Sequence, residues 1–353
     1  MAENIRMDSH KLIYHPGRVA DWLNGKNIYP IEIEISPSGA CNHRCIFCAL
    51  DYMGYKPNFL KKDVILPTVK QMHAKGLKSV ICAGEGEPLL NRDFPEIANA
   101  MKGYGLDVAM STNGVLLTKE ISSECLQAFT WIRFSVASMQ ESSYQSIQQG
   151  VEGDLDKVCE NIQEAVKIKK DNGLHTTLGV QCLLIPQNIG QILEMAEKLR
   201  ELGVDYFTVK PYMAHTMTNN SFNVDYSAMG ELERELKQYE TENYQIYFRI
   251  HAMEKMKKCK TYSKCYALPF MVHIDAKGNV WPCVELINKD GFSYGNIYQN
   301  TFHEIWNSEQ RRSVIDKVNQ MDLNIQCGES CRLDEMNRYL QELKQPGGHV
   351  NFI

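Results

Sequence analysis

The sequence predicts an α/β fold: a partial (β/α)6 TIM-like barrel followed by a small region with a β-hairpin and helices. Three observations support this class. Short β-rich runs alternate with helical stretches from residue 31 to residue 242, a pattern typical of a parallel sheet with right-handed crossovers. Six such units are present, fewer than a closed eightfold barrel requires. Near Glu254 the alternation ends and a cysteine-bearing segment begins.

The barrel elements follow one another in a regular order. The predicted strands are the β-rich runs at 31–36, 79–83, 107–111, 131–136, 176–184 and 206–211. The predicted helices lie near 61–75, 93–104, 118–128, 141–171, 188–202 and 227–242. Because the carboxyl ends of parallel strands meet at one edge of the sheet, we expect the active residues in the segments that follow the strands.

Two regions lie outside this alternation. Residues 1–30 contain a short helical pattern at 15–24, which predicts a cap on one end of the barrel. The barrel is expected to span residues 31–250, and the second region residues 251–353. There, a turn with Gly278 at a position suited to positive φ predicts a hairpin over 271–281. Helices are expected near 301–318 and 332–344.

Composition and charge exclude several classes of protein. The chain has 353 residues, of which 44% are hydrophobic and 23% charged, so it can bury a large core. Its formal net charge of −5 disfavours a general nucleic-acid-binding function. No apolar run approaches the roughly 18 residues of a membrane span, and the first residues lack the order of a signal peptide. We therefore expect a cytoplasmic protein with no nucleic-acid and no membrane partner.

Twelve cysteines are many for a reducing compartment. Structural disulfides are rare there, so clustered cysteines favour metal binding or redox chemistry. One group comes early in the chain and a second comes late, at positions 259, 265, 283, 327 and 331. The remaining four are expected to be buried small hydrophobic residues: Cys82, Cys125, Cys159 and Cys182.

The early group is Cys41, Cys45 and Cys48, directly after the first predicted strand. A compact loop can turn three thiolates toward one centre at this spacing, yet a zinc site or a cubane cluster wants four ligands. In a [4Fe–4S] cluster, one iron would then be free to bind a small molecule. This stretch resembles the signature of the radical S-adenosylmethionine (SAM) superfamily, and the resemblance implies that Phe47 lies near the adenine of SAM.

Three further motifs resemble cofactor-binding segments of that superfamily. Gly86-Glu87-Pro88 follows the second strand and resembles the Gly-Gly-Glu-Pro motif that holds the amino group of SAM, with Glu85 in place of the first glycine. The turn after the third strand resembles the segment near the cofactor ribose, and the fourth strand resembles one whose serine reaches the ribose or carboxylate. The resemblance thus implies cofactor contacts from Thr112, Asn113 and Ser135.

Several polar residues of the barrel have open roles. Lys210 and His215 come at the end of the sixth strand, where either a catalytic role or a solvated loop would explain them. Glu32 and Glu34 share one face of the first strand. They fit a structural role at the inner face of the barrel as well as a substrate contact.

The late cysteines can form a second metal site. Cys265 and Cys283 frame the predicted hairpin, and a later pair can complete a four-thiolate site for a cluster or for zinc. The spacing resembles the SPASM or twitch extension of radical SAM enzymes, which implies one auxiliary [4Fe–4S] cluster. The two remaining ligands come from Cys259, Cys327 and Cys331, with Cys331 preferred. The cysteine left over, with Cys327 as a candidate, could donate a hydrogen atom to a substrate radical.

The resemblance implies reductive cleavage of SAM to methionine and a 5′-deoxyadenosyl radical, which abstracts a hydrogen atom from a substrate. An electron donor such as flavodoxin or ferredoxin would supply the electron. We expect a small-molecule substrate, such as a sugar, an aminocyclitol or a nucleotide-linked precursor, because no leader-binding region precedes residue 30 and only one auxiliary cluster is expected. Oxidation and epimerisation are both open.

Two other functions are compatible with parts of the pattern. A SPASM-type enzyme that modifies peptides or proteins would use the same clusters on a different substrate. An iron–sulfur electron carrier or a zinc-binding module would need no SAM, but it would need a fourth protein ligand at the first cluster.

Overall fold

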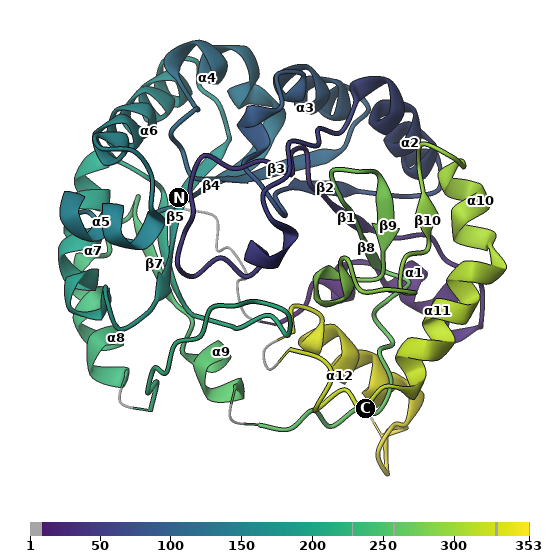
Figure 1. The fold of residues 1–353 in the computed structure, drawn as a ribbon. Coiled ribbons are helices and arrows are strands. Elements are labelled where there is room, and N and C mark those ends of the chain that lie inside the picture. The colour runs from purple at the N-terminus through teal and green to yellow at the C-terminus, as the bar shows by residue number, and fades with distance from the viewer. Residues whose placement is uncertain (1–8, 228, 257, 329–330, 353) are drawn as a thin grey trace.

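The computed structural model describes residues 9–352 except 228, 257, 329 and 330. Its strands form one ten-stranded sheet in the order β10-β9-β8-β1-β2-β3-β4-β5-β6-β7, with the helices around the outside (Figure 1). The strands are β1 Glu32–Ile35, β2 Ser79–Cys82, β3 Asp107–Thr112, β4 Phe129–Ser135, β5 Thr177–Leu184, β6 Tyr206–Pro211, β7 Gln245–Phe248, β8 Met271–Ile274, β9 Asn279–Trp281 and β10 Gly295–Asn296.

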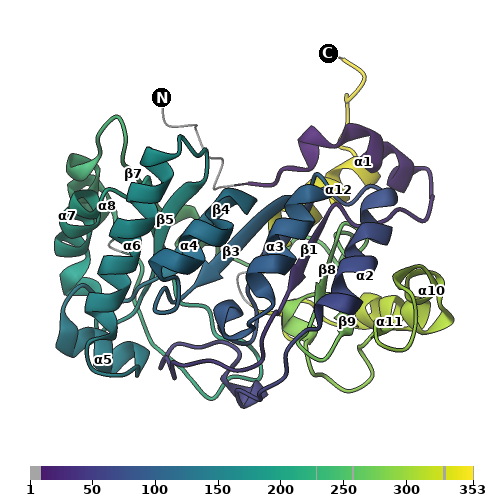
Figure 2. The same cartoon turned by 90° about the horizontal axis from the view of Figure 1, so that it is seen from above.

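The helices alternate with the strands as the sequence predicts. Those of the barrel are α2 Lys62–Ala74, α3 Phe94–Gly103, α4 Lys119–Cys125, α5 Glu141–Gln148, α6 Asp154–Asp171, α7 Ile192–Leu202 and α8 Gly230–Leu236. Before and after them come α1 Pro16–Leu23, α9 Ile250–Lys255, α10 Phe302–Asn307, α11 Glu309–Gln320 and α12 Asp334–Lys344. Figure 2 shows α2, α3, α4 and α6 side by side along one face of the sheet.

The strands pack against these helices through alternate residues. In β1, β3 and β4 one face carries fully buried aliphatic or aromatic residues of the main core, such as Ile33, Met110 and Phe134. The opposite face carries polar residues, among them Glu34 and Arg133. Since side chains alternate across a strand, the inner face of the sheet is available for function while the outer face provides the core.

The barrel is longer than the six predicted units. β7 pairs in parallel with β6, and β8 pairs in parallel with β1. The predicted helix at 227–242 is only the short α8, followed by a single 3₁₀ turn, and the chain then returns as β7. The predicted hairpin is β8 and β9, and it continues the barrel sheet rather than standing apart from it.

Two predicted helices are divided. The one at 141–171 is interrupted between α5 and α6, where Gln149 and Gly153 have φ values of 49° and 81°. The one at 301–318 is interrupted at Ser308, whose extended backbone and side chain cap α11. Both interruptions contain residues that favour turns or helix caps. These residues end one helix and begin the next, although the sequence on either side favours helix.

The regions at the chain ends also pack onto the sheet. Trp22 of α1 contacts the rings of Tyr266 and Phe270 just before β8. Residues 1–8 of the predicted cap lie outside the described residues, and the cap stays a prediction. Of the four scattered cysteines, three are buried and Cys159 is half-buried, in agreement with their expected packing role. No helix among the described residues is long and apolar enough to cross a membrane.

Candidate metal centres and cofactor site

Cys41, Cys45 and Cys48 lie on the loop that follows β1, at the carboxyl edge of the parallel strands. The backbone N–H of Cys48 donates to the carbonyl of Cys45, which closes a tight turn. Burial raises the pKa of the Cys45 thiol well above its usual value, and the neighbouring sulfurs of Cys48 and Cys41 raise it further. Three half-buried thiols on one short loop, with raised pKa values, are readily deprotonated only by a bound cation, so this donor set fits a metal cluster.

The histidine inside the cysteine loop does not complete the ligand set. His43 is buried, its Nε2 lies 3.2 Å from Asp154 Oδ2, and its Nδ1 lies 3.3 Å from Gln148 Nε2. A side chain at Gly150 would meet the imidazole at 2.6 Å. The sequence contained His43 within the motif but gave no partner for it, because α5 and α6 come about a hundred residues later. The set of three thiols thus fits a cluster with one open iron.

Gly86 lets the loop after β2 lie against the segment that leads into the cysteine loop. A Cβ atom at Gly86 would be 2.2 Å from the carbonyl oxygen of Ala40 and 2.5 Å from that of Ser38. The N–H of Glu87 donates to the same Ala40 carbonyl, and Pro88 begins a short 3₁₀ helix. The glycine is therefore required by close backbone approach.

The Glu87 carboxylate joins the turns after β2 and β3. Its Oε1 accepts from the Thr112 hydroxyl at 2.7 Å, and its Oε2 accepts from the Asn113 N–H at 2.8 Å. The Asn113 amide in turn donates to Oδ1 of Asn42 in the cysteine loop at 2.7 Å. The structure thus brings Glu87, Thr112 and Asn113 together beside the three cysteines.

Phe47 and Ser135 lie at the same edge of the sheet. Phe47 packs with Ile46 against a small apolar cluster that includes Ala137 and Tyr212. Ser135 ends β4, and its carbonyl accepts from the Gln148 amide that also contacts His43. The contacts of the Phe47 ring and the Ser135 hydroxyl with a bound cofactor stay predictions.

Glu85 contacts the second region instead of the cysteine loop. It is 5% exposed, and its Oε1 accepts from the N–H of Ala276 in the β8–β9 turn at 2.7 Å. Burial, together with the charge of Asp275, raises the pKa of this carboxyl to about 7, although the hydrogen bond from Ala276 acts in the opposite direction. The residue that departs from the glycine motif thus connects the loop after β2 to the hairpin.

Four late cysteines line one small, mainly apolar cavity: Cys265, Cys283, Cys327 and Cys331. Its other walls include Leu268, Leu286, Val318, Leu323 and Leu333. Burial, followed by the neighbouring sulfurs, raises the pKa of Cys283 well above its usual value. Cys259, by contrast, is exposed and does not line the cavity.

Both sets of cysteines suit a cluster better than a single ion. No group of three or more His, Cys, Asp or Glu side chains in the described part of the chain is arranged to hold one metal ion. A polynuclear iron–sulfur cluster spaces its thiolates farther apart than one tetrahedral zinc ion does. Four thiols around an apolar cavity therefore fit an auxiliary iron–sulfur cluster.

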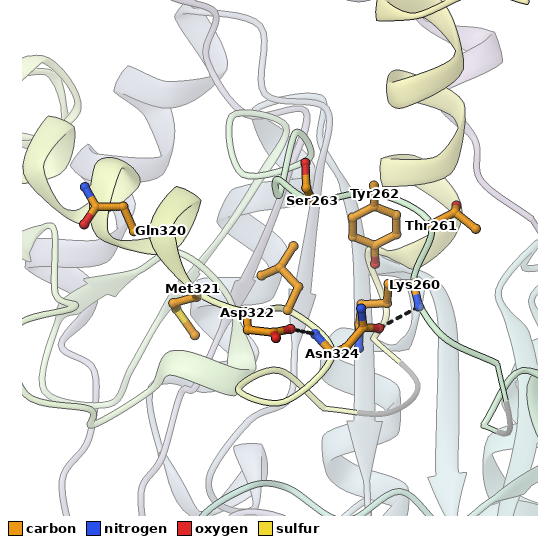
Figure 3. A pocket seen from close by; sticks show the side chains of 9 residues that line it. Lys260, Thr261, Tyr262, Ser263, Gln320, Met321, Asp322 and Asn324 are labelled. Carbon is orange, nitrogen blue, oxygen red and sulfur yellow. Dashed lines mark hydrogen bonds between the residues drawn. The ribbon is translucent and has the colours of Figure 1, made fainter.

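A second pocket, of about 430 Å³, lies on the solvent side of this cavity. Its walls come from two segments, 260–263 and 320–324, which Figure 3 shows facing each other. The N–H of Lys260 donates to Oδ1 of Asn324 at 2.7 Å and joins the two segments. Met321 and Leu323 line both pockets, so a thin layer of side chains separates the four cysteines from this outer pocket.

His215 is buried between the two sets of cysteines instead of lying in a solvated loop. Its ring stacks on Tyr52 of the cysteine loop, with centroids 4.8 Å apart. Its Nε2 donates to the carbonyl of Val284 at 3.2 Å, and its Nδ1 accepts from the N–H of Met217. Both ring nitrogens therefore have protein partners, which favours a positioning role for His215.

Glu32 and Glu34 are engaged by Arg332, the residue after Cys331. One guanidinium nitrogen lies 2.6 Å from Glu32 Oε1, and the other contacts Glu34 Oε2. Of the two roles that the sequence left open, the structural one accounts for both carboxylates. Lys210 faces the same inner side of the sheet from β6.

The fold and the two cysteine sites define a barrel protein with an open three-thiol cluster site and a separate four-thiol site. Comparison with known protein families supports this description of the two sites. Residues 35–199 match the radical SAM superfamily, and residues 265–332 match an iron–sulfur cluster-binding domain of the SPASM type. The chain is a radical SAM protein with a C-terminal SPASM domain, and these domains imply a [4Fe–4S] cluster, SAM and auxiliary iron–sulfur binding.

Two relatives illustrate the range of similar sequences. A probable GTP 3′,8-cyclase of Sulfurisphaera tokodaii is 31% identical over 175 residues, which cover 49% of this chain and 53% of the relative. A tungsten-containing aldehyde ferredoxin oxidoreductase cofactor-modifying protein of Pyrococcus furiosus is 25% identical over 292 residues, covering 76% and 79%. The match with the cyclase therefore spans only about half of that protein.

Solved structures show the same fold at low sequence identity. Streptococcus suis SuiB bound to S-adenosylmethionine has a TM-score of 0.67 at 18% identity and covers 95% of this chain and 79% of its own. The protein anSMEcpe with bound AdoMet has a TM-score of 0.60 at 15% identity, covering 89% and 95%. These similarities confirm the predicted fold class.

Proposed function

We propose that this protein is a radical SAM enzyme that abstracts hydrogen from a small-molecule substrate and thereby oxidises or epimerises it. The observation that carries the proposal is the set of three thiols at the carboxyl edge of the sheet, for which the described residues offer no fourth protein ligand. When bound, the cluster at Cys41, Cys45 and Cys48 would supply the electron that cleaves SAM and releases the hydrogen-abstracting 5′-deoxyadenosyl radical. An external one-electron donor such as flavodoxin or ferredoxin would reduce this cluster.

The protein residues at this edge would bind and orient the cofactor. We assign Gly86, Pro88 and the backbone of Glu87 to the amino group of SAM, and Phe47 to its adenine. Thr112, Asn113 and Ser135 would form the polar wall near the ribose and the carboxylate. The hydrogen bonds that join Glu87 to the β3 turn hold this wall in place before the cofactor binds, which favours pre-organised binding.

We assign one auxiliary [4Fe–4S] cluster to Cys265, Cys283, Cys327 and Cys331. The shared cavity supports this choice, and it leaves Cys259 as the fifth cysteine. Cys327 would then be a ligand and not a hydrogen-atom donor. In an oxidation, this cluster could accept the electron that the substrate radical must lose.

Two relatives support a small-molecule substrate, because one is a probable GTP 3′,8-cyclase and the other a cofactor-modifying protein. A sugar, an aminocyclitol or a nucleotide-linked precursor fits this reading. Peptide modification is the second candidate, because the SuiB fold, which covers 98% of this chain, is also known bound to its precursor peptide SuiA.

The test is to incubate anaerobically reconstituted, reduced protein with SAM and libraries of small molecules and of peptides, while 5′-deoxyadenosine is quantified. A small molecule that stimulates 5′-deoxyadenosine release supports the proposal. A product oxidised by two electrons identifies a dehydrogenase, whereas solvent deuterium in the product identifies an epimerase. Stimulation by peptides alone would favour the second candidate, and protein that releases no 5′-deoxyadenosine under any of these conditions would contradict both.

A further inference from the structure

Two cations, Arg133 and Lys210, lie on the inner face of the sheet, Arg133 two residues before Ser135 on β4 and Lys210 nearer the proposed cofactor edge on β6. Arg133 of β4 is in register with Gly179 of β5, which in turn is in register with Tyr206 of β6. Since side chains two residues apart share a face, Thr208 and Lys210 extend the same face along β6. Strands β4, β5 and β6 therefore present these side chains to one space.

Glycine at position 179 leaves room for the Tyr206 ring to lie across β5. A Cβ atom there would lie 2.1 Å from the ring of Tyr206, so the ring occupies the place of a β5 side chain. The Tyr206 ring is thereby brought toward Arg133, and the two groups interact electrostatically. The lack of a side chain at Gly179 thus allows Tyr206 and Arg133 to interact across β5.

Neutral groups hold the Arg133 guanidinium. It lies over the ring of Trp131, with 5.0 Å between Cζ and the ring centroid. Its Nη2 donates to the Ser111 hydroxyl at 3.1 Å, while its Nε is buried without a hydrogen-bond partner. No carboxylate among the described residues forms a salt bridge with Arg133.

The neighbouring polar groups of β6 also have unused hydrogen-bonding capacity. The hydroxyl oxygen of Thr208 is buried without a partner in the described part of the chain, and Thr208 is 2% exposed. No hydrogen bond or ion pair joins the Lys210 ammonium group to another described residue. A buried polar group that lacks a partner destabilises the fold, so the Thr208 hydroxyl and the Arg133 Nε favour a ligand that accepts hydrogen bonds.

The charges around Lys210 are mostly positive. Burial and the neighbouring Arg133, Arg249 and Arg332 lower the pKa of Lys210 to about 7. Glu34 is the acidic group that opposes this effect, but Glu34 is already bound to Arg332. A bound anion would offset the charges of Arg133 and Lys210 and favour the protonated amine.

We propose that Arg133 and Lys210 form an anion-binding site that takes a carboxylate or phosphate group of the substrate, with Thr208 as a further donor. The site rests on the proposed function and narrows it to an anionic substrate. Ser135 lies two residues beyond Arg133 on the same face, about 7 Å farther along the strand. A molecule anchored at Arg133 therefore extends toward the cofactor edge, where its reacting carbon would meet the radical.

The test uses the anaerobically reconstituted chain saturated with SAM and titrated by calorimetry at constant ionic strength. Inorganic pyrophosphate probes the phosphate alternative, succinate the carboxylate alternative, and erythritol is the neutral control. We expect one of the two anions to bind and erythritol not to bind. Arg133→Gln and Lys210→Met should each weaken anion binding at least about tenfold, or about 1.4 kcal/mol, whereas Lys210→Arg should retain most of it.

Lys167→Met is the matched control, because Lys167 is an exposed lysine of α6. Iron content and SAM affinity establish that each variant is folded. The inference is overturned if neither anion binds, or if Lys210→Met and Lys167→Met bind the anion equally well. SAM cleavage in the wild type, measured separately, tests the proposed function: cleavage without anion binding overturns this inference alone, and anion binding without cleavage contradicts the proposed function alone.

Discussion

Glu85 departs from the family motif, and the structure gives its side chain a contact with the second region of the chain. The family motif has a glycine in place of Glu85, and no role for a carboxylate at this position could be predicted from the sequence. In the fold, this side chain crosses to the β8–β9 turn and accepts from the N–H of Ala276. Because it is buried with Asp275 nearby, its pKa rises from 4.5 to about 7. A carboxyl group that protonates near neutral pH thus sits between the barrel and the SPASM domain.

We predict that Glu85→Gln stabilises the protein at pH 8 and has little effect at pH 5. The folded-state pKa of Glu85 lies above the value of 4.5 for the unfolded chain, so the folded state binds the proton more tightly. Stability is therefore lost as the pH rises from about 4.5 through about 7. Glutamine keeps the acceptor oxygen but cannot ionise, and the gain at pH 8 should reach up to about 3 kcal/mol.

The measurement is the anaerobic thermal midpoint of wild type and variant from pH 5 to pH 8. Glu160→Gln serves as the control, because Glu160 is exposed on α6 and should give a difference independent of pH. A Glu85→Gln effect of the same size at pH 5 and pH 8 would rule out ionisation of this carboxyl as the cause.

At the scale of the elements, the position of the cysteine loop depends on α5 and α6, two helices far away in the sequence. His43 is held by Asp154 at the first turn of α6 and by Gln148 at the end of α5. The short break between these helices, with Gly150 against the imidazole, brings both partners to the loop. The orientation of the first cluster loop is therefore set by the α5–α6 junction.

We predict that Asp154→Ala lowers thermal stability and reduces occupancy of the first cluster. The change leaves the buried Nε2 of His43 without its partner, which costs about 1–3 kcal/mol. Asp156→Ala is a matched control: Asp156 also belongs to the first turn of α6 but is exposed. It should change stability by no more than about 0.5 kcal/mol. Iron content and thermal midpoint measure both effects, and equal losses in the two variants would contradict the positioning role.

The hairpin and the segment after α11 together determine the auxiliary site. We predict about eight iron atoms per chain after reconstitution, four for each cluster. Replacing any one of the four cysteines that line the cavity by alanine should lower the iron content toward about four. Cys259→Ala should leave it unchanged, because that thiol is exposed. The assignment would be contradicted if Cys259→Ala lost iron while Cys331→Ala kept its full iron content. Cys259 would then be the cluster ligand and Cys331 the fifth cysteine.

At the scale of the whole molecule, the sequence predicted the features that depend on local order. Strand and helix alternation predicted the six barrel units, and the spacing of three cysteines predicted the first site. Contacts between distant segments were not predictable: the pairing of β8 with β1, the choice among five late cysteines, and the bonds of Arg332 to Glu32 and Glu34. Each of these depends on how far separated segments pack, which one sequence does not encode as a local pattern.

The position of β8 bears on the predicted boundary between the barrel and the SPASM domain. That boundary, at residues 250 and 251, would allow the barrel to be separated if each part folded alone. In the structure, β8 pairs in parallel with β1 over Glu32 to Ile35, and its residues are buried. Removing the second region would expose the unpaired edge of β1 and the apolar surface beside it.

We therefore predict that a chain shortened to residues 1–264 aggregates and fails to bind SAM, although it keeps the first three cysteines. A chain shortened to residues 1–345 is the control, because it loses only the exposed tail after α12 and should retain the fold. Gel filtration, circular dichroism and SAM binding under anaerobic conditions distinguish the two outcomes. A monomeric 1–264 chain that binds SAM would show that the barrel is independent of β8 and that the sequence-based boundary also separates two folding units.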